Sequence, residues 1–160
     1  MAIQNLQAST AIEVIPSDTI DIPNPAAKVA SGAQDGGPTA NKLIDSTATF
    51  TDSVKEGNIV YDTDGLEIAT VDSVDSDTQL TLSADIFTGT ENYTIYDHTA
   101  KSNPSLYIGV SGAVSVEMAG TGSSVILKGV TAGSTLPINV TRVNSTGTTT
   151  IVAGDIIALF

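Results

Sequence analysis

The stretch SLYIGVSGAVSVEM, residues Ser105–Met118, decides the fold. In its second half Val114, Val116 and Met118 alternate with polar residues. Successive side chains of a strand point to opposite faces, so these three apolar side chains share one face. The pattern therefore predicts a β-strand that buries one face and leaves the other polar.

The same kind of pattern continues to the end of the chain. Short alternating stretches are separated by glycine-rich turns at a spacing of roughly ten residues, which favours a β-sandwich or a small barrel. The 22 Thr and 16 Ser, together with abundant Val and Ile, also favour strands. An all-β fold is predicted. The expected strands are Leu106–Val110, Val114–Met118, Val125–Leu127, Leu136–Val143 and Ile156–Phe160.

The first strand that this block needs lies far upstream. The segment EVIPSDTIDIPNPA, Glu13–Ala26, ends about eighty residues before Ser105. Polar stretches at Lys28–Asn41 and His98–Ser105 read as linkers, and domain insertions are tolerated at exposed loops. We therefore predict a discontinuous antiparallel β-sandwich or barrel with an inserted small antiparallel β domain. The predicted parts are an extended N-terminal arm (1–12), an outer β domain (13–27 plus 101–160) and an acidic insert with flanking linkers (28–100).

The insert has its own strand pattern. Asn58–Val74 predicts a hairpin, because alternating apolar residues flank an Asp64-Gly65 turn. Two further strands are expected within Thr78–Ile86 and Glu91–Asp97. The stretch Ser46–Gly57 allows one helical turn. These elements predict an antiparallel unit of four or five strands.

The charge of the chain is concentrated in the insert. The whole chain has 18 acidic and six basic residues and a net charge of −12, and residues 28–100 hold 13 of the acidic and three of the basic residues. Nucleic-acid backbones and anionic membranes attract Lys and Arg, so no nucleic-acid or membrane partner is expected. The near-neutral outer domain is better suited to subunit contacts, because interface cores are depleted of charge.

Composition also bears on the compartment. The chain has no Cys, which excludes disulfides and thiol chemistry and fits assembly in a reducing cytoplasm. The first residues show no signal-peptide pattern, and no apolar run approaches the ~20 residues of a membrane span. A soluble protein is predicted.

Residues suited to catalysis are scarce. The single histidine, His98, lies in the second linker beside Asp97, and neighbours in an extended chain point in opposite directions. There is no His/Cys cluster for zinc, no G-x-S-x-G elbow and no phosphate-binding or dinucleotide fingerprint. The glycine-rich stretch Gly120–Ser124 joins two strands and reads as a hairpin loop. We therefore expect no enzyme, no catalytic residue, no cofactor and no metal.

The acidic turns of the insert leave one alternative open. Calcium needs six to eight convergent oxygens, of which such turns supply only a few, whereas Asp favours turns through its own hydrogen bonds. Structural turns are therefore the preferred interpretation. The carboxylates concerned are Asp62, Asp64 and Glu67 in the first turn and Asp72, Asp75 and Asp77 in the second.

The four tyrosines leave a second alternative open, because exposed aromatic rings in the insert could stack on glycans. Their places in strand patterns favour the core or its edge. The residues are Tyr61, Tyr93, Tyr96 and Tyr107.

Several motifs of the outer domain resemble the spike-base proteins of tailed-phage and gene-transfer-agent heads. The similar segments are VIPSDTIDIP with its Pro16–Thr19 motif, the strand that begins at Leu106–Gly109, the strand Leu136–Val143, and the STGTTTIVAGDIIALF terminus that ends at Ile156–Phe160. The likeness covers about half the chain, Glu13–Pro25 plus Ser105–Phe160. The insert, which departs from the family pattern, resembles a small β module found among phage structural proteins.

This resemblance implies a non-enzymatic structural protein on the exterior of a bacteriophage capsid, either a head spike base or a decoration (cement) protein. It implies virion localisation after assembly in the host cytoplasm. The expected partners are the major capsid protein, sister subunits in a homo-oligomer (trimer or pentamer) and a spike or fibre protein. The alternative is a host-surface glycan-binding adhesion module displayed on the virion.

Overall fold

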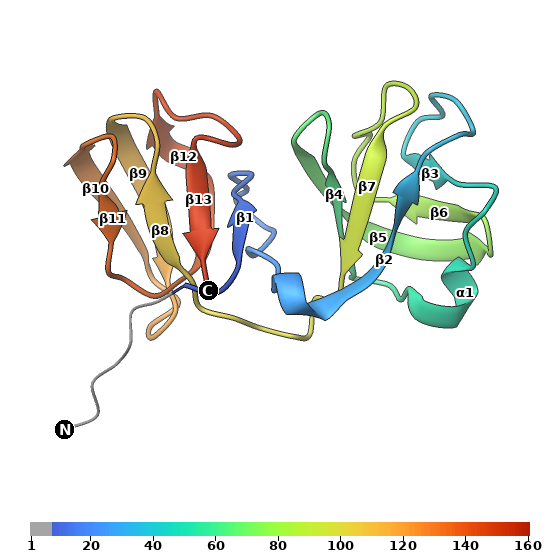
Figure 1. Cartoon of the computed structure of the whole chain (residues 1–160), viewed down its shortest axis with the longest axis horizontal. Helices are drawn as coiled ribbons and strands as arrows, with labels where there is room; N and C mark the ends of the chain where they lie inside the picture. The colour runs from blue at the N-terminus through green and yellow to red at the C-terminus, as the bar shows by residue number, and fades with distance from the viewer. Residues whose placement is uncertain (1–7) are drawn as a thin grey trace. The chain divides into compact units, whose positions relative to one another are not determined.

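The computed structural model describes residues 8–160 (Figure 1). These residues form thirteen strands, one four-residue helix and one short 3-10 turn, which confirms the all-β prediction. The chain divides into two compact units. Unit 1 combines the residues up to Asp18 with Ser102–Phe160, and unit 2 comprises Thr19–Lys101.

Unit 1 contains two antiparallel sheets. The four-stranded sheet has the order β1 (Ala11–Glu13), β13 (Ile156–Leu159), β8 (Ser105–Ile108), β11 (Thr135–Leu136). The three-stranded sheet has the order β10 (Ser124–Val130), β9 (Gly112–Met118), β12 (Val140–Thr149). An upstream edge strand does lie beside the C-terminal strand, with Ile12 opposite Ala158. It is Ala11–Glu13, however, so the prediction of the first strand within Glu13–Ala26 is wrong except at Glu13.

The core of unit 1 comes from one face of each sheet. Leu106 and Ile108 of β8 are fully buried while Tyr107 between them is exposed, which is the alternation expected of a half-buried strand. Val114 and Val116 of β9 are also fully buried, although the polar Ser115 between them is buried as well. Each such side chain contributes about 1.5–3 kcal/mol on burial. Two sheets with one apolar face each make a small β-sandwich.

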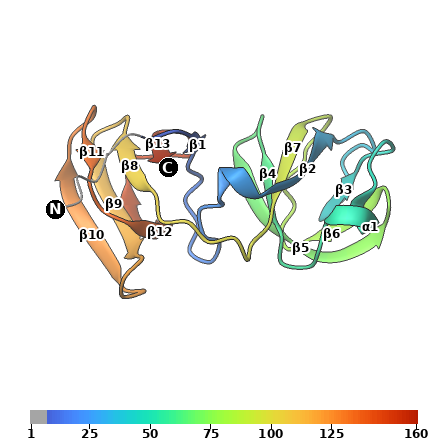
Figure 2. The same ribbon diagram turned by 60° about the horizontal axis from the view of Figure 1, so that its bottom comes forward.

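Unit 2 is a single six-stranded antiparallel sheet that curls around its own core (Figures 1 and 2). Its order is β2 (Lys28–Ala33), β7 (Asn92–Tyr96), β4 (Ile59–Asp62), β5 (Glu67–Ser76), β6 (Gln79–Leu82), β3 (Lys42–Ile44). The 3-10 turn Pro25–Ala27 precedes β2, and helix α1 (Phe50–Ser53) follows β3. Leu43, Phe50 and Leu80 are among the largest core side chains. The predicted hairpin at Asp64-Gly65 and the helical turn are confirmed.

The prediction of a linker at Lys28–Asn41 is wrong in its first half. Lys28–Ala33 forms β2, paired along β7. This strand consists mostly of small residues, which hide the alternation that marks a strand in the sequence. Glycine is required at position 32, because a Cβ on Gly32 would overlap the Asp45 carboxylate and lie 2.8 Å from the Tyr93 hydroxyl oxygen.

The boundary between the units also differs from the predicted one. Unit 2 begins at Thr19, so residues 19–27 leave the outer domain to which the sequence assigned them. Of the predicted arm, residues 1–7 lie outside the described residues. The remainder is not an arm, because the Ser9 amide donates to the Phe160 carbonyl at 2.6 Å and Ala11 begins β1.

The strand predicted over Leu136–Val143 is interrupted. Pro137 has no amide hydrogen to donate to a neighbouring strand. The Ile138 amide donates to the Leu136 carbonyl at 2.8 Å, a tight turn that ends β11, and β12 begins at Val140. A single predicted strand therefore becomes two strands in different sheets.

Candidate functional site

Strand β12 contains a bulge that is bonded to the N-terminal segment of unit 1. Asn144 pairs with Ser115 and Thr149 pairs with Ala113, so four residues of β12 stand opposite a single residue of β9. The Thr148 hydroxyl accepts from the Ser115 amide at 3.0 Å and donates to the Asn144 carbonyl at 2.6 Å. These bonds replace the ladder bonds that the bulge interrupts.

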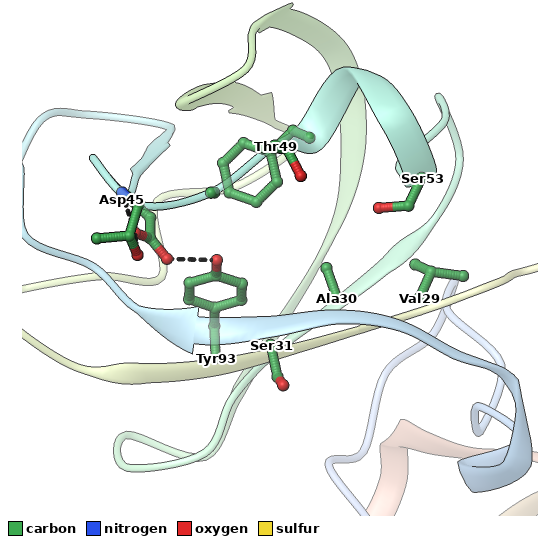
Figure 3. Close-up of a pocket in the computed structure, with 10 residues that line it drawn as sticks. Val29, Ala30, Ser31, Asp45, Thr49, Ser53 and Tyr93 are labelled. Atoms are coloured by element: carbon green, nitrogen blue, oxygen red, sulfur yellow. Dashed lines mark hydrogen bonds between the residues drawn. The ribbon is translucent and has the colours of Figure 1, made fainter.

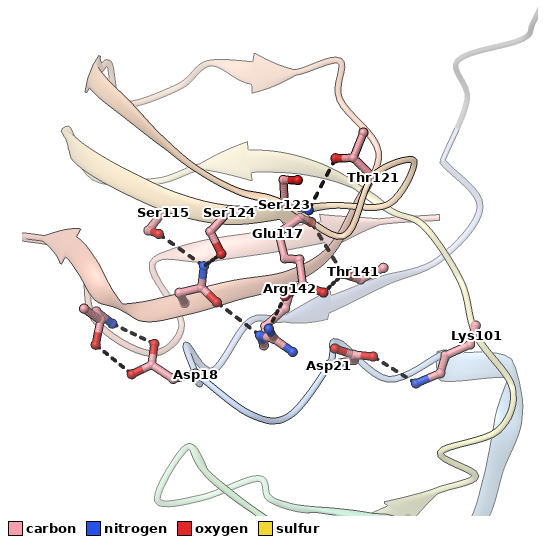
Figure 4. A network of polar contacts seen from close by, with 12 residues as sticks. Asp18, Asp21, Lys101, Ser115, Glu117, Thr121, Ser123, Ser124, Thr141 and Arg142 are labelled. Carbon is pink, nitrogen blue, oxygen red and sulfur yellow. Dashed lines mark hydrogen bonds and ion pairs between the residues drawn. The ribbon is translucent and has the colours of Figure 1, made fainter.

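Asp18 fastens this bulge from the other end of the sequence (Figure 4). One carboxylate oxygen accepts from the Thr146 amide at 2.9 Å, and the other accepts from the Thr146 hydroxyl at 2.7 Å. Hydrogen bonds from Thr146 hold the pKa of Asp18 below its ordinary value. The Pro16–Thr19 motif is thus bonded to the TGTT stretch (146–149) of the C-terminal motif, more than a hundred residues away in the sequence.

The polar face of β9 carries a network that joins all three strands of its sheet (Figure 4). Arg142 of β12 pairs with Glu117 of β9. The Asn144 side-chain nitrogen donates to the Ser115 and Ser124 hydroxyls, at 3.2 Å each. Because these partners come from β12, β9 and β10, the network holds the sheet together.

Strand β10 is exposed on both faces. Val125, on the core side of the sheet, is 42% exposed, and Ile126, on the other side, is 50% exposed. In the sheet order β10 has β9 as its neighbour on one side and no strand of the described residues on the other. This strand is therefore an open edge.

Unit 2 contains a shallow cleft of about 260 Å³ between β2 and helix α1 (Figure 3). Its lining combines hydroxyl groups with apolar side chains. Thr49 and Ser53 contribute hydroxyls from the side of α1, and Val29 and Ala30 contribute apolar side chains from β2, whereas the Ser31 side chain points away from the cleft (Figure 3).

A buried hydrogen bond underlies the cleft. The Tyr93 hydroxyl donates to Asp45 at 2.7 Å, and both residues are at most 3% exposed. Burial and the neighbouring carboxylate raise the pKa of Tyr93 well above its ordinary value. Burial alone would raise the pKa of Asp45, but hydrogen bonds from Tyr93 and Thr47 outweigh it and lower that pKa. The pair is thus a neutral phenol bonded to a carboxylate.

The structure places the tyrosines of the insert in the interior. Tyr61, Tyr93 and Tyr96 are at most 9% exposed, so they do not form the aromatic face that a stacked sugar would require. Tyr107 of unit 1 is 39% exposed. His98 is half-buried, and its Nδ1 lies 3.3 Å from the side-chain nitrogen of Asn58. The sequence did not indicate this contact, because the residues are forty positions apart.

Three carboxylates of the acidic turns, those of Asp62, Asp64 and Asp75, accept hydrogen bonds within the fold. Asp62 accepts from the Asp64 amide at 2.9 Å, and Asp64 accepts from the Asn92 amide at 2.8 Å. Asp75 accepts from Lys42 and Gln79. Hydrogen bonds, first of all from Lys42, hold the pKa of Asp75 far below its ordinary value. Across residues 8–160, no group of three or more His, Asp or Glu side chains is arranged to hold a metal ion.

No protein-family model matches the chain, and no curated protein or solved structure is significantly similar to it. In the described part of the chain, no helix has the length and apolar character needed to cross a membrane.

Proposed function

We propose that this chain is a non-enzymatic structural protein on the exterior of a tailed-phage capsid, a head spike base or a decoration protein. In this proposal unit 1 attaches to the major capsid protein and to sister subunits. Unit 2 is an added module with its own core.

The proposal rests on one observation: the motifs that resemble spike-base proteins lie in contact with one another in unit 1. Asp18, from the Pro16–Thr19 motif, bonds Thr146 of the TGTT motif. The strand that begins at Leu106 pairs with the C-terminal strand, with Leu106 opposite Ala158. Motifs that were identified separately in the sequence thus build one sandwich, as parts of a single ancestral domain should.

The distribution of charge supports the same division of roles. Unit 2 contains 14 of the 18 acidic residues and four of the six basic residues. Unit 1 retains four acidic and two basic residues, of which Glu117 and Arg142 pair with each other. A surface with few charges is the better one for a stable protein contact, because buried charges lose hydration.

Binding to capsids tests the proposal. Purified chain is mixed with capsids of the phage whose genome encodes it, from particles that lack this protein, and the mixture is sedimented. Co-sedimentation that saturates at a fixed number of copies per capsid is expected. Absence of the chain from intact virions by mass spectrometry, together with no capsid binding, would reject the proposal.

Glycan binding by unit 2 is the second candidate, and the hydroxyl-lined cleft is the observation in its favour. Thr49 and Ser53 offer hydroxyls beside the apolar side chains of Val29 and Ala30, a combination found in small-molecule sites. A glycan array of the wild type and of Ser53→Phe, which fills the cleft, tests this function. The exposed Thr90→Phe is the matched control. Equal glycan-array signals for both variants and the wild type would exclude the cleft as the glycan-binding site.

A further inference from the structure

Strand β10 is the longest open edge of unit 1 among the described residues. Strands β1 and β11 are edges of only three and two residues. The outer side of β12 is occupied, because the Ser17 amide donates to the Val143 carbonyl at 2.9 Å and Asp18 bonds Thr146. Natural sheets keep exposed edges short, charged or covered. The seven residues of β10 include four with apolar side chains and a single charge, Lys128.

The backbone groups that β10 presents outward follow from its register. The Met118 amide donates to the Ser123 carbonyl at 3.0 Å, so Ser123 faces β9. In antiparallel pairs successive residues alternate between bonding the partner and pointing away from it. Val125 therefore bonds toward β9, and Ile126 directs its amide and carbonyl outward.

We propose that β10 pairs with β10 of a second copy, antiparallel, about a two-fold axis that passes through Ile126. The two copies of Ile126 then exchange both backbone hydrogen bonds. The two-fold axis stands perpendicular to the sheet and keeps equivalent faces on the same side. Val125 lies opposite Leu127 of the second copy, which extends the apolar face of the sandwich across the axis.

A second copy fits this edge because the pairing is self-complementary. In the stated register the opposed residues are Val125 with Leu127 and Ile126 with itself, so no charged residues oppose each other. A chain of net charge −12 repels its own copies over most of its surface, and β10 has no acidic residue. A register shift with Gly129 at φ +68° ends the regular strand after Leu127, which limits the pairing to the segment around Ile126.

This pairing specifies the self-association that the proposed function assumes, but it concerns two free chains and does not require a capsid. It also gives a definite stoichiometry. A two-fold contact predicts a dimer rather than the trimer or pentamer that the resemblance implies.

A single-cysteine variant tests the geometry, since the natural chain has no cysteine. Residues opposed in a hydrogen-bonded antiparallel pair have Cα atoms about 5.5 Å apart, which suits a disulfide. Mild oxidation of Ile126→Cys should therefore give a covalent dimer on a non-reducing gel. Val152→Cys is the control, because Val152 is 66% exposed but lies outside the strands.

Sedimentation velocity of Ile126→Asp supplies the second readout. Two carboxylates opposed across the axis should raise the dimer dissociation constant by at least about ten-fold, whereas Val152→Asp should leave it unchanged. A monomeric wild type at high concentration, a trimer or pentamer insensitive to Ile126→Asp, or equal crosslinking of both cysteine variants would overturn the pairing. A dimer that fails to bind capsids would reject the proposed function and leave the pairing standing.

Discussion

Asp18 links the start of unit 1 to the bulge near its end through both carboxylate oxygens. We expect Asp18→Ala to speed amide hydrogen exchange at Thr146 several-fold at neutral pH, because the amide loses its acceptor. Asp18→Asn keeps one acceptor oxygen and should show a smaller effect. The pKa of Asp18 is lowered in the folded chain, so its stabilisation is full above the ordinary value of 3.8 and is lost as the pH falls through the folded value. Identical exchange in all three proteins would contradict this role.

The buried bond from Tyr93 to Asp45 gives a residue-scale prediction for unit 2. Tyr93→Phe leaves one buried carboxylate oxygen without its donor and should lower the free energy of unfolding by about 1–3 kcal/mol at pH 7. Thr90→Ala, at an exposed residue of the same unit, should have little effect. The measurement is denaturant unfolding followed by a probe in unit 2.

The pH dependence of the Tyr93→Phe effect has a definite sign. The pKa of Asp45 is lowered in the folded wild type, so the ionised carboxylate contributes stability above the unfolded value and loses it as the pH falls through the folded value. The stability difference between wild type and Tyr93→Phe should therefore shrink below about pH 4. A difference that grows on acidification would show that Asp45 is not the group involved.

At the scale of the element, β2 tests whether a strand of small residues is set by packing. Gly32→Ala places a methyl group against Asp45 and the Tyr93 hydroxyl, and such overpacking costs about 1–3 kcal/mol. Gly89→Ala is the control in the same unit, because a Cβ there meets nothing within 4 Å. Thermal unfolding of the two variants measures the difference. Equal melting temperatures would mean that β2 shifts to accommodate the methyl group.

The sequence could predict those elements whose signals are local, and it could not predict those that depend on contacts between distant residues. Strands β4 and β5 were predictable, because apolar alternation and the Asp64-Gly65 turn are local signals. Strand β2 was not, since its requirement for Gly32 comes from Asp45 and Tyr93, which only the fold brings near. The open edge at β10 was missed for a similar reason: the sequence predicts a strand at Val125–Leu127, but only the sheet order shows that this strand has a single neighbour.

At the scale of the whole molecule, residues that are far apart in the sequence belong to the same structural unit. Unit 1 is assembled from two segments that lie 83 residues apart, yet its sheets include no strand of unit 2. The discontinuity was predictable because the charge and turn composition change at both boundaries. The position of the first boundary was not, because Pro23 and Pro25 fit either an extended strand or the turn that precedes β2.

Each unit has its own core, so damage to one core should remain local. Phe50→Ala removes a fully buried ring from unit 2 and should cost about 3–5 kcal/mol. Leu106→Ala in unit 1 should cost about 2–5 kcal/mol. Hydrogen exchange with mass spectrometry resolves the two units: Phe50→Ala should raise exchange in β4–β7 and spare β8 and β9, and Leu106→Ala should do the reverse. Loss of protection across both units in either variant would show that they fold as one cooperative body.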